Sequence, residues 1–175
     1  MSAGANDFSP KDPMTMWYDV PATATGGKNV WMEYSLPIGN GQLGGSLFGG
    51  LNKDEIQFNE KTLWTGKTSD MQGYGAGYGQ YKNFGSIYVE DLSGVFLPGK
   101  DGDVKDYVRS LDLQEGIGRV VCSSDKYMTS YDRTYFVSNP DKVMVARYTA
   151  TGKKKLHLLF SFAPGRDINA SPVTY

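Results

Sequence analysis

Six glycines lie within residues 39–50, and this density constrains the chain more than any other feature of its sequence. Each glycine inside a helix costs about 1 kcal/mol relative to alanine, so the segment cannot form a stable helix. The stretch GNGQLG at residues 39–44 matches the glycine spacing of a dinucleotide-binding turn, which requires a helix beginning at its last glycine. Because three more glycines follow, no such helix is expected, and the sequence argues against a nucleotide site.

The rest of the chain predicts an all-β protein. Short apolar runs alternate with turn signals, and 22 glycines, 8 prolines and 13% aromatic residues favour an antiparallel β-sandwich, with almost no helical periodicity. With 175 residues the chain is large enough for one domain. The predicted strands are residues 43–48, 55–59, 86–92, 107–113, 119–123, 127–137, 143–150 and 156–162.

The clearest strand is 156–162, where two leucines and two phenylalanines at the even positions share one face. In segments 107–113 and 127–137, charged residues alternate with aromatic ones. Such alternation is typical of a strand with one solvent-facing side, so we expect Arg109 and Arg133 to face solvent. The alternative is that they stack on Tyr107 or Tyr135 in a structural role.

Composition excludes several function classes. The 18 basic and 19 acidic residues leave a formal net charge of −1, which does not favour nucleic acid as a partner. No run approaches the roughly 20 apolar residues that cross a bilayer, so no membrane partner is expected. The single cysteine, Cys122, rules out an internal disulfide and is expected to pack in the core. With one histidine, His157, neither a catalytic triad nor a metal site is predicted, and no cofactor is expected.

Several blocks in order resemble the amino-terminal domain of family 95 glycoside hydrolases, the α-L-fucosidase and α-L-galactosidase group. The resemblance extends from Trp17 to about Phe162 and is carried mainly by LPIGNGQLG at residues 36–44 and QFNEKTLWTG at residues 57–66. The segments YVRSLDL (107–113) and YDRTYFVSNPDKV (131–143) are similar to later strand motifs of the family.

The resemblance implies a β-sandwich of the super-sandwich type, occupying residues 16–175 and incomplete at its C-terminal end, after a disordered leader or cloning remnant at residues 1–15. It also implies a parent enzyme of inverting, α-L-fucosidase-like activity, whose helical catalytic barrel is absent from this chain but is its partner in the same polypeptide. This chain alone is then expected to carry no catalytic residues and no activity. An extracytoplasmic location is suggested by the resemblance alone.

Candidate site residues follow from the polar and aromatic pattern. Asn59, Glu60, Thr62 and Trp64 close a predicted strand and could line a sugar cleft or a domain interface. The pattern favours a structural role, in which Asn59 and Glu60 satisfy backbone groups in a turn and Trp64 fills the core. Tyr74 and Tyr78 lie in a glycine–tyrosine segment and could stack on a sugar ring. A stand-alone carbohydrate-binding module that takes fucosylated or galactosylated oligosaccharide is therefore the alternative function. A third interpretation is an interaction domain that pairs through an exposed sheet edge.

Overall fold

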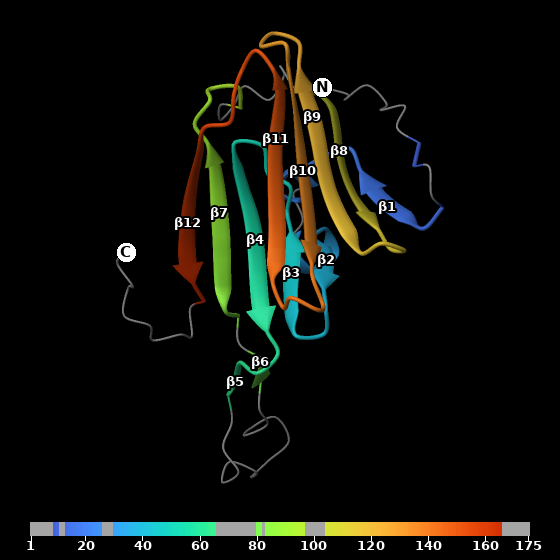
Figure 1. Ribbon diagram of the computed structural model, residues 1–175, viewed down its shortest axis with the longest axis vertical. Coiled ribbons are helices and arrows are strands. Elements are labelled where there is room, and N and C mark those ends of the chain that lie inside the picture. Colours follow the sequence, from blue (N-terminus) through green and yellow to red (C-terminus); the bar gives the residue numbers. More distant parts are fainter. Residues whose placement is uncertain are drawn as a thin grey trace.

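The computed structural model describes residues 9–10, 13–25, 30–65, 80–81, 83–96 and 104–165. In these ranges the chain forms two five-stranded antiparallel sheets that lie one over the other, and a separate two-stranded hairpin extends below them (Figure 1). The predicted all-β sandwich is confirmed.

The first sheet has the strand order β1-β8-β9-β10-β11. The second sheet has the order β12-β7-β4-β3-β2, and β5 pairs with β6. The strands are β1 (Thr15–Tyr18), β2 (Leu36–Gly39), β3 (Leu43–Leu47), β4 (Lys53–Glu60), β5 (Trp64–Thr65), β6 (Gln80–Tyr81), β7 (Gly85–Asp91), β8 (Lys105–Asp112), β9 (Ile117–Ser124), β10 (Thr129–Val137), β11 (Met144–Gly152) and β12 (Leu158–Pro164). The described helical segments are the 3-10 turn η1 (Ala22–Thr25) and the short helix α1 (Val30–Glu33).

All eight predicted strands are present, with ends that differ by a few residues. The structure adds β1, β2 and the β5–β6 hairpin. Strand β2 was not predicted, because it contains Pro37, which cannot donate a backbone hydrogen bond. Proline in a strand is typical of edge strands. Here β2 is an edge strand, paired on one side with β3.

The glycine-rich segment forms a β-hairpin. Strands β2 and β3 pair antiparallel and are joined by a turn in which Gly41 has φ of 84°, a conformation that favours glycine. The Oδ1 atom of Asn40 accepts hydrogen bonds from the backbone N–H groups of Gln42 and Leu43 at 2.9 and 2.8 Å. Gly44 lies in a strand, so the dinucleotide-binding turn is excluded by geometry.

Apolar side chains from both sheets fill the space between them. Leu47 and Ile56 of the second sheet and Val120 of the first are each at most 2% exposed. Cys122 lies in the same cluster, as predicted, and burial raises the pKa of its thiol to about 11. Alternation along β9 and β10 places every second residue in this core.

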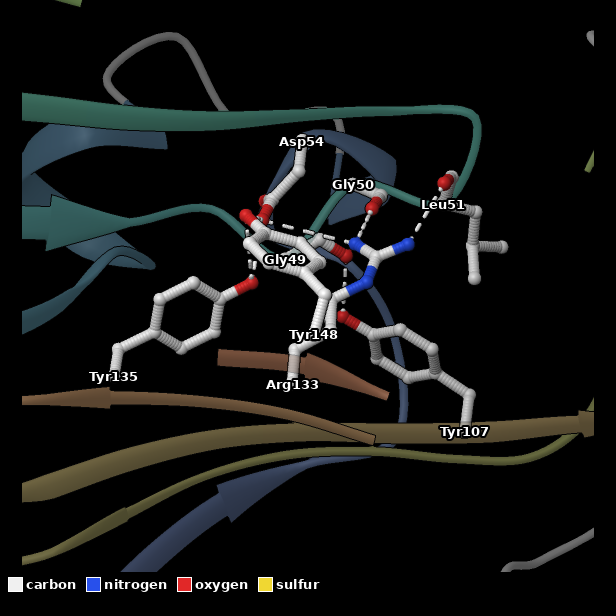
Figure 2. Close-up of polar contacts among 8 residues, drawn as sticks. All are labelled: Gly49, Gly50, Leu51, Asp54, Tyr107, Arg133, Tyr135 and Tyr148. Atoms are coloured by element: carbon white, nitrogen blue, oxygen red, sulfur yellow. Dashed lines mark hydrogen bonds and ion pairs between the residues drawn. The ribbon is translucent and has the colours of Figure 1, made fainter. Parts of the chain in front are cut away.

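A buried polar network lies between the two sheets, beside the bend that joins β3 to β4 (Figure 2). Arg133 on β10 donates hydrogen bonds to the backbone carbonyls of Gly50 and Leu51 at 2.5 and 3.0 Å. Its guanidinium also lies 3.7 Å from the carboxylate of Asp54 on β4. Strand β10 belongs to one sheet and β4 to the other, so this network joins the two layers.

Three tyrosines complete the network. Tyr135 and Tyr148 direct their hydroxyls to Asp54 at 2.5 and 3.2 Å, and Tyr107 donates to the carbonyl of Gly49 at 2.6 Å. Burial, together with the charge of Asp54, raises the pKa of both Tyr135 and Tyr148. Their hydroxyls therefore stay protonated and act as donors at neutral pH.

The expectation that Arg109 and Arg133 face solvent is wrong. Arg109 is 0% exposed and Arg133 is 5% exposed. Arg109 donates to the carbonyl of Tyr34 and places its guanidinium 4.6 Å from the ring centre of Tyr18. Arg109 shares its strand face with Leu111, and Arg133 shares its face with Tyr135; both faces are covered, and backbone carbonyls accept hydrogen bonds from the two guanidinium groups there.

Strand β12 lies at the edge of the second sheet, and in Figure 1 β12 and β7 extend beyond β11. Phe160 and Phe162 are consequently 61% and 52% exposed, although they point to the same side of the sheet as the core. Phe162 contacts the rings of Phe58 and Phe84, with centroid distances of 6.0 and 6.3 Å. The strand begins at Leu158, not at residue 156 as predicted.

None of the helices among these residues is long and apolar enough to span a lipid bilayer.

Because Arg133 and Asp54 form a buried ion pair, replacing Arg133 should destabilise the fold far more than replacing an arginine on the surface. Replacing Arg133 with methionine leaves the carboxylate of Asp54 without its counter-charge and two backbone carbonyls without their donor, and we expect a loss of about 3–5 kcal/mol in the free energy of unfolding. Arg119→Met is the matched control, because Arg119 pairs with Asp132 on the exposed surface and should cost less than about 1 kcal/mol. Urea unfolding measures both, and equal losses would contradict the central role of Arg133.

The raised pKa of Cys122 predicts an unreactive thiol. At pH 8 a group with a pKa of about 11 is far less ionised than an ordinary thiol, and the thiolate is the reactive form. We expect its reaction with an aromatic disulfide reagent to be at least about a hundredfold slower in the folded chain than in urea. Release of the coloured thiol measures this rate, and similar rates in both states would contradict the burial.

Candidate functional site

The candidate site lies on the outer face of the second sheet. Leu36, Ile38 and Leu47 point into the core, so the residues that alternate with them point outward. The strand register aligns one outward row, and a second row follows beside it. The first row contains Pro37, Ser46, Gln57 and Ser86, and the second contains Gly39, Gly44 and Asn59.

A hollow of about 570 Å³ lies over these rows, in the size range of small-molecule sites. We call it the sheet groove. It is lined by Trp31, Pro37, Ile38, Gly44, Gly45, Ser46, Gln57, Phe58, Asn59 and Asn83. None of these residues is charged, and three carry amide groups. Gly44 forms part of the floor of the groove, and the space above it is open. A Cβ at this position would have only the carbonyl oxygen of Ile38 nearby, at 3.9 Å.

Two of the amides are held in fixed orientations. The Oδ1 atom of Asn59 accepts the backbone N–H of Glu60 at 2.9 Å, and that of Asn83 accepts the N–H of Gly85 at 3.0 Å. Each asparagine thus keeps its NH₂ group as a donor for another partner. Among the described residues, Ser46 and Gln57 make no side-chain hydrogen bond, so both can donate and accept.

A second, shallower hollow of about 300 Å³ adjoins the groove and shares Gly44 and Asn59 with it. Its remaining lining residues are Gly39, Gly41, Gln42, Leu43 and Lys61. The turn that begins at Asn40 therefore borders the site. This turn is also fastened to the other sheet, because the Asn40 Nδ2 atom donates to the carbonyl of Ser138 at 2.6 Å.

Of the predicted site residues, Asn59 lines the groove and Glu60 does not. The Oε2 atom of Glu60 accepts hydrogen bonds from the backbone N–H and the hydroxyl of Thr62. These bonds, the hydroxyl one first, lower the pKa of Glu60, so it stays ionised at neutral pH. Glu60 and Thr62 therefore close the turn after β4.

Trp64 lies in β5, and its side chain is outside the described set. Tyr74 and Tyr78 lie outside the described residues. A role for these three side chains, and for Asn59, Glu60 and Thr62 at a cleft or domain interface, stays a prediction.

Sequence reasoning missed Trp31, Ser46, Gln57 and Asn83 as members of one site. Alternation in β4 could have paired Gln57 with Asn59 on one face. Trp31 and Asn83 are far from both in sequence, and only the folded chain brings them to the same hollow. Trp31 is 53% exposed, which is unusual for so large an apolar side chain.

The described lining of the groove suits a polar, uncharged molecule. Hydrolysis of a glycosidic bond commonly uses two carboxyl groups that face each other across the bond. No carboxyl group is found among the described residues that line the groove, and the nearby Glu55 accepts hydrogen bonds from Ser86 and Tyr88. No group of three or more potential metal-ligating side chains is found in the described part of the chain.

Comparison with known families decides the class of this domain. The model described as "Glycosyl hydrolase family 65, N-terminal domain" matches residues 16–77 and 67–172, which is most of the chain. The chain belongs to this family of glycoside hydrolase N-terminal domains. The N-terminal domain expected from the motifs is thus confirmed, whereas assignment to family 95 in particular stays a prediction.

Two curated relatives of this glycoside hydrolase domain are fucosidases by name. The chain is 28% identical over 165 residues to "Alpha-L-fucosidase 2" of Arabidopsis thaliana, covering 80% of this chain and 19% of that protein. It is 25% identical over 168 residues to "Probable alpha-fucosidase A" of Aspergillus niger, covering 78% and 20%. The domain spans about a fifth of the length of these relatives.

The turn that borders the groove yields a stability prediction. Replacing Asn40 with alanine removes the acceptor for two backbone N–H groups and the bond to Ser138, so we expect a loss of about 1–3 kcal/mol in the free energy of unfolding. Asn139→Ala is the control, because its exposed amide makes one bond to the carbonyl of Asn40 and should cost less than about 1 kcal/mol. Thermal or urea unfolding distinguishes the two, and equal losses would contradict this role of Asn40.

Proposed function

We propose that this chain is the N-terminal β-sandwich of an α-L-fucosidase-like glycoside hydrolase, where it supports a helical catalytic barrel in the same polypeptide and borders the substrate cleft. The observation that carries the proposal is the match of the glycoside hydrolase N-terminal domain model to most of the chain. The names of the two relatives support the fucosidase class.

The lining of the groove supports a non-catalytic role. A hydrolase site would need an acid and a base or nucleophile, and the sheet groove offers amides, a hydroxyl and an indole. The chain corresponds to about a fifth of each relative, which leaves ample length in a protein of that size for a catalytic domain. In this proposal the barrel cleaves the glycosidic bond and the sandwich supports the barrel.

The sequence alternative, a stand-alone carbohydrate-binding module, is favoured by one feature, the uncharged groove with an exposed tryptophan. The intact mass of the natural protein in its source cells separates the two. A mass several times the 19.2 kDa of this chain supports the glycosidase domain. A mass near 19.2 kDa supports the binding module.

The proposed function predicts that the purified 175-residue chain does not hydrolyse 4-nitrophenyl α-L-fucoside, because no carboxyl pair is found among the described residues of its groove. The longer natural polypeptide should release nitrophenol under the same conditions, and deleting the sandwich from it should lower its melting temperature as well as its activity. Turnover by the purified chain, or an inactive longer polypeptide, would overturn the proposal.

A further inference from the structure

We propose that the sheet groove binds a segment of neutral oligosaccharide, with Trp31 as the stacking surface and the amides of Asn59 and Asn83 as hydrogen-bond donors. The inference rests on the proposed function only for the class of ligand, a glycan. It goes further by assigning a binding site, separate from bond cleavage, to this domain.

The charge of the lining argues for an uncharged ligand. A charged group that leaves water needs an opposite charge or several hydrogen bonds to compensate. Among the described residues that line the groove there is no lysine, arginine, aspartate or glutamate, and Lys61 lines only the adjoining hollow. Sugar hydroxyls lose little by comparison when amides and hydroxyls replace their water partners. The groove therefore favours a neutral sugar over a nucleotide, a phosphopeptide or an acidic glycan.

The donors are positioned before any ligand arrives. Asn59 and Asn83 each fix their carbonyl oxygen on a backbone N–H, at 2.9 and 3.0 Å, and so present an NH₂ group in a set direction. Sugar hydroxyl and ring oxygens accept such bonds. Because these side chains are already ordered, binding costs less conformational entropy than it would with mobile donors.

Trp31 offers an apolar contact to a sugar ring, and Gly44 leaves the floor of the groove open. Trp31 leaves about half of its surface exposed at the groove wall, where an indole can pack on the C–H face of a sugar ring. Gly44 lets a ring approach the backbone of β3 closely, since no side chain stands there. The volume of about 570 Å³ accommodates a short oligosaccharide rather than a single small ion.

The test is a titration of the ¹⁵N-labelled chain followed by NMR, with 2′-fucosyllactose as the neutral probe and 3′-sialyllactose as a charged probe on the same lactose core. We expect 2′-fucosyllactose to shift the indole N–H of Trp31 and the side-chain amides of Asn59 and Asn83. The charged probe should bind at least about threefold more weakly, because its carboxylate finds no cation among the described lining residues.

Two variants test the groove itself. Trp31→Ala removes the stacking surface, and Gly44→Val fills the floor from a position where a Cβ meets no close contact. Each should weaken 2′-fucosyllactose binding by at least about tenfold. Their controls are Met32→Ala, next to Trp31 and 73% exposed, and Ser161→Val, on the outer face of β12, and both should keep the affinity within about twofold.

Three outcomes would overturn the inference: no binding of 2′-fucosyllactose, tighter binding of the sialylated probe, or equal affinity in the groove variants and the original chain. Circular dichroism of each variant verifies that the sandwich is intact. The two proposals fail separately, because a chain that binds no sugar can still belong to an active fucosidase. A chain that hydrolyses fucoside on its own would contradict the proposed function and leave the groove in place.

Discussion

The pairing of Arg133 with Asp54 is the interaction on which the arrangement of the two sheets depends. Arg133 reaches across the core to the bend between β3 and β4 and satisfies the carbonyls of Gly50 and Leu51. The bend has no room for a side chain at residue 50, since a Cβ there would lie 2.0 Å from the carbonyl oxygen of Lys53. The tight bend fixes β3 beside β4, and the outer faces of these two strands form the floor of the sheet groove.

The polar groups of the core have a structural role. Buried ion pairs contribute little net stability compared with apolar residues of similar size, but they make alternative packings costly, because a misplaced charge would be left unpaired. Here one guanidinium, one carboxylate and three tyrosine hydroxyls must meet at one place between the sheets. In this sandwich we expect that requirement to select a single alignment of the layers.

Much of the fold could be predicted from the sequence, whereas the site could not. Glycine density excluded helices, and alternation located eight strands, because both effects are local. Burial is not local: Arg109 and Arg133 looked solvent-facing, and Phe160 lies at an uncovered edge, since exposure depends on how far the opposite sheet extends. Trp31 and Asn83 come together at the groove because of the strand register and the position of helix α1. Neither can be read from the spacing of residues in the sequence. At the end of β4, Asn59 lines the groove, and Glu60 and Thr62 bond to each other in the turn that follows; their role at a cleft or domain interface stays a prediction.

The two neighbouring glycines of β3, Gly44 and Gly45, differ in how easily they can be replaced by a larger residue. Gly45 faces the core, where a Cβ would lie 2.7 Å from the end of the Met144 side chain, so a larger residue there requires repacking. Gly44 faces outward and has space above it. One codon change at residue 44 could therefore close the groove without disturbing the sandwich. A lineage could lose or regain this surface in single steps, independently of the selection that preserves the fold.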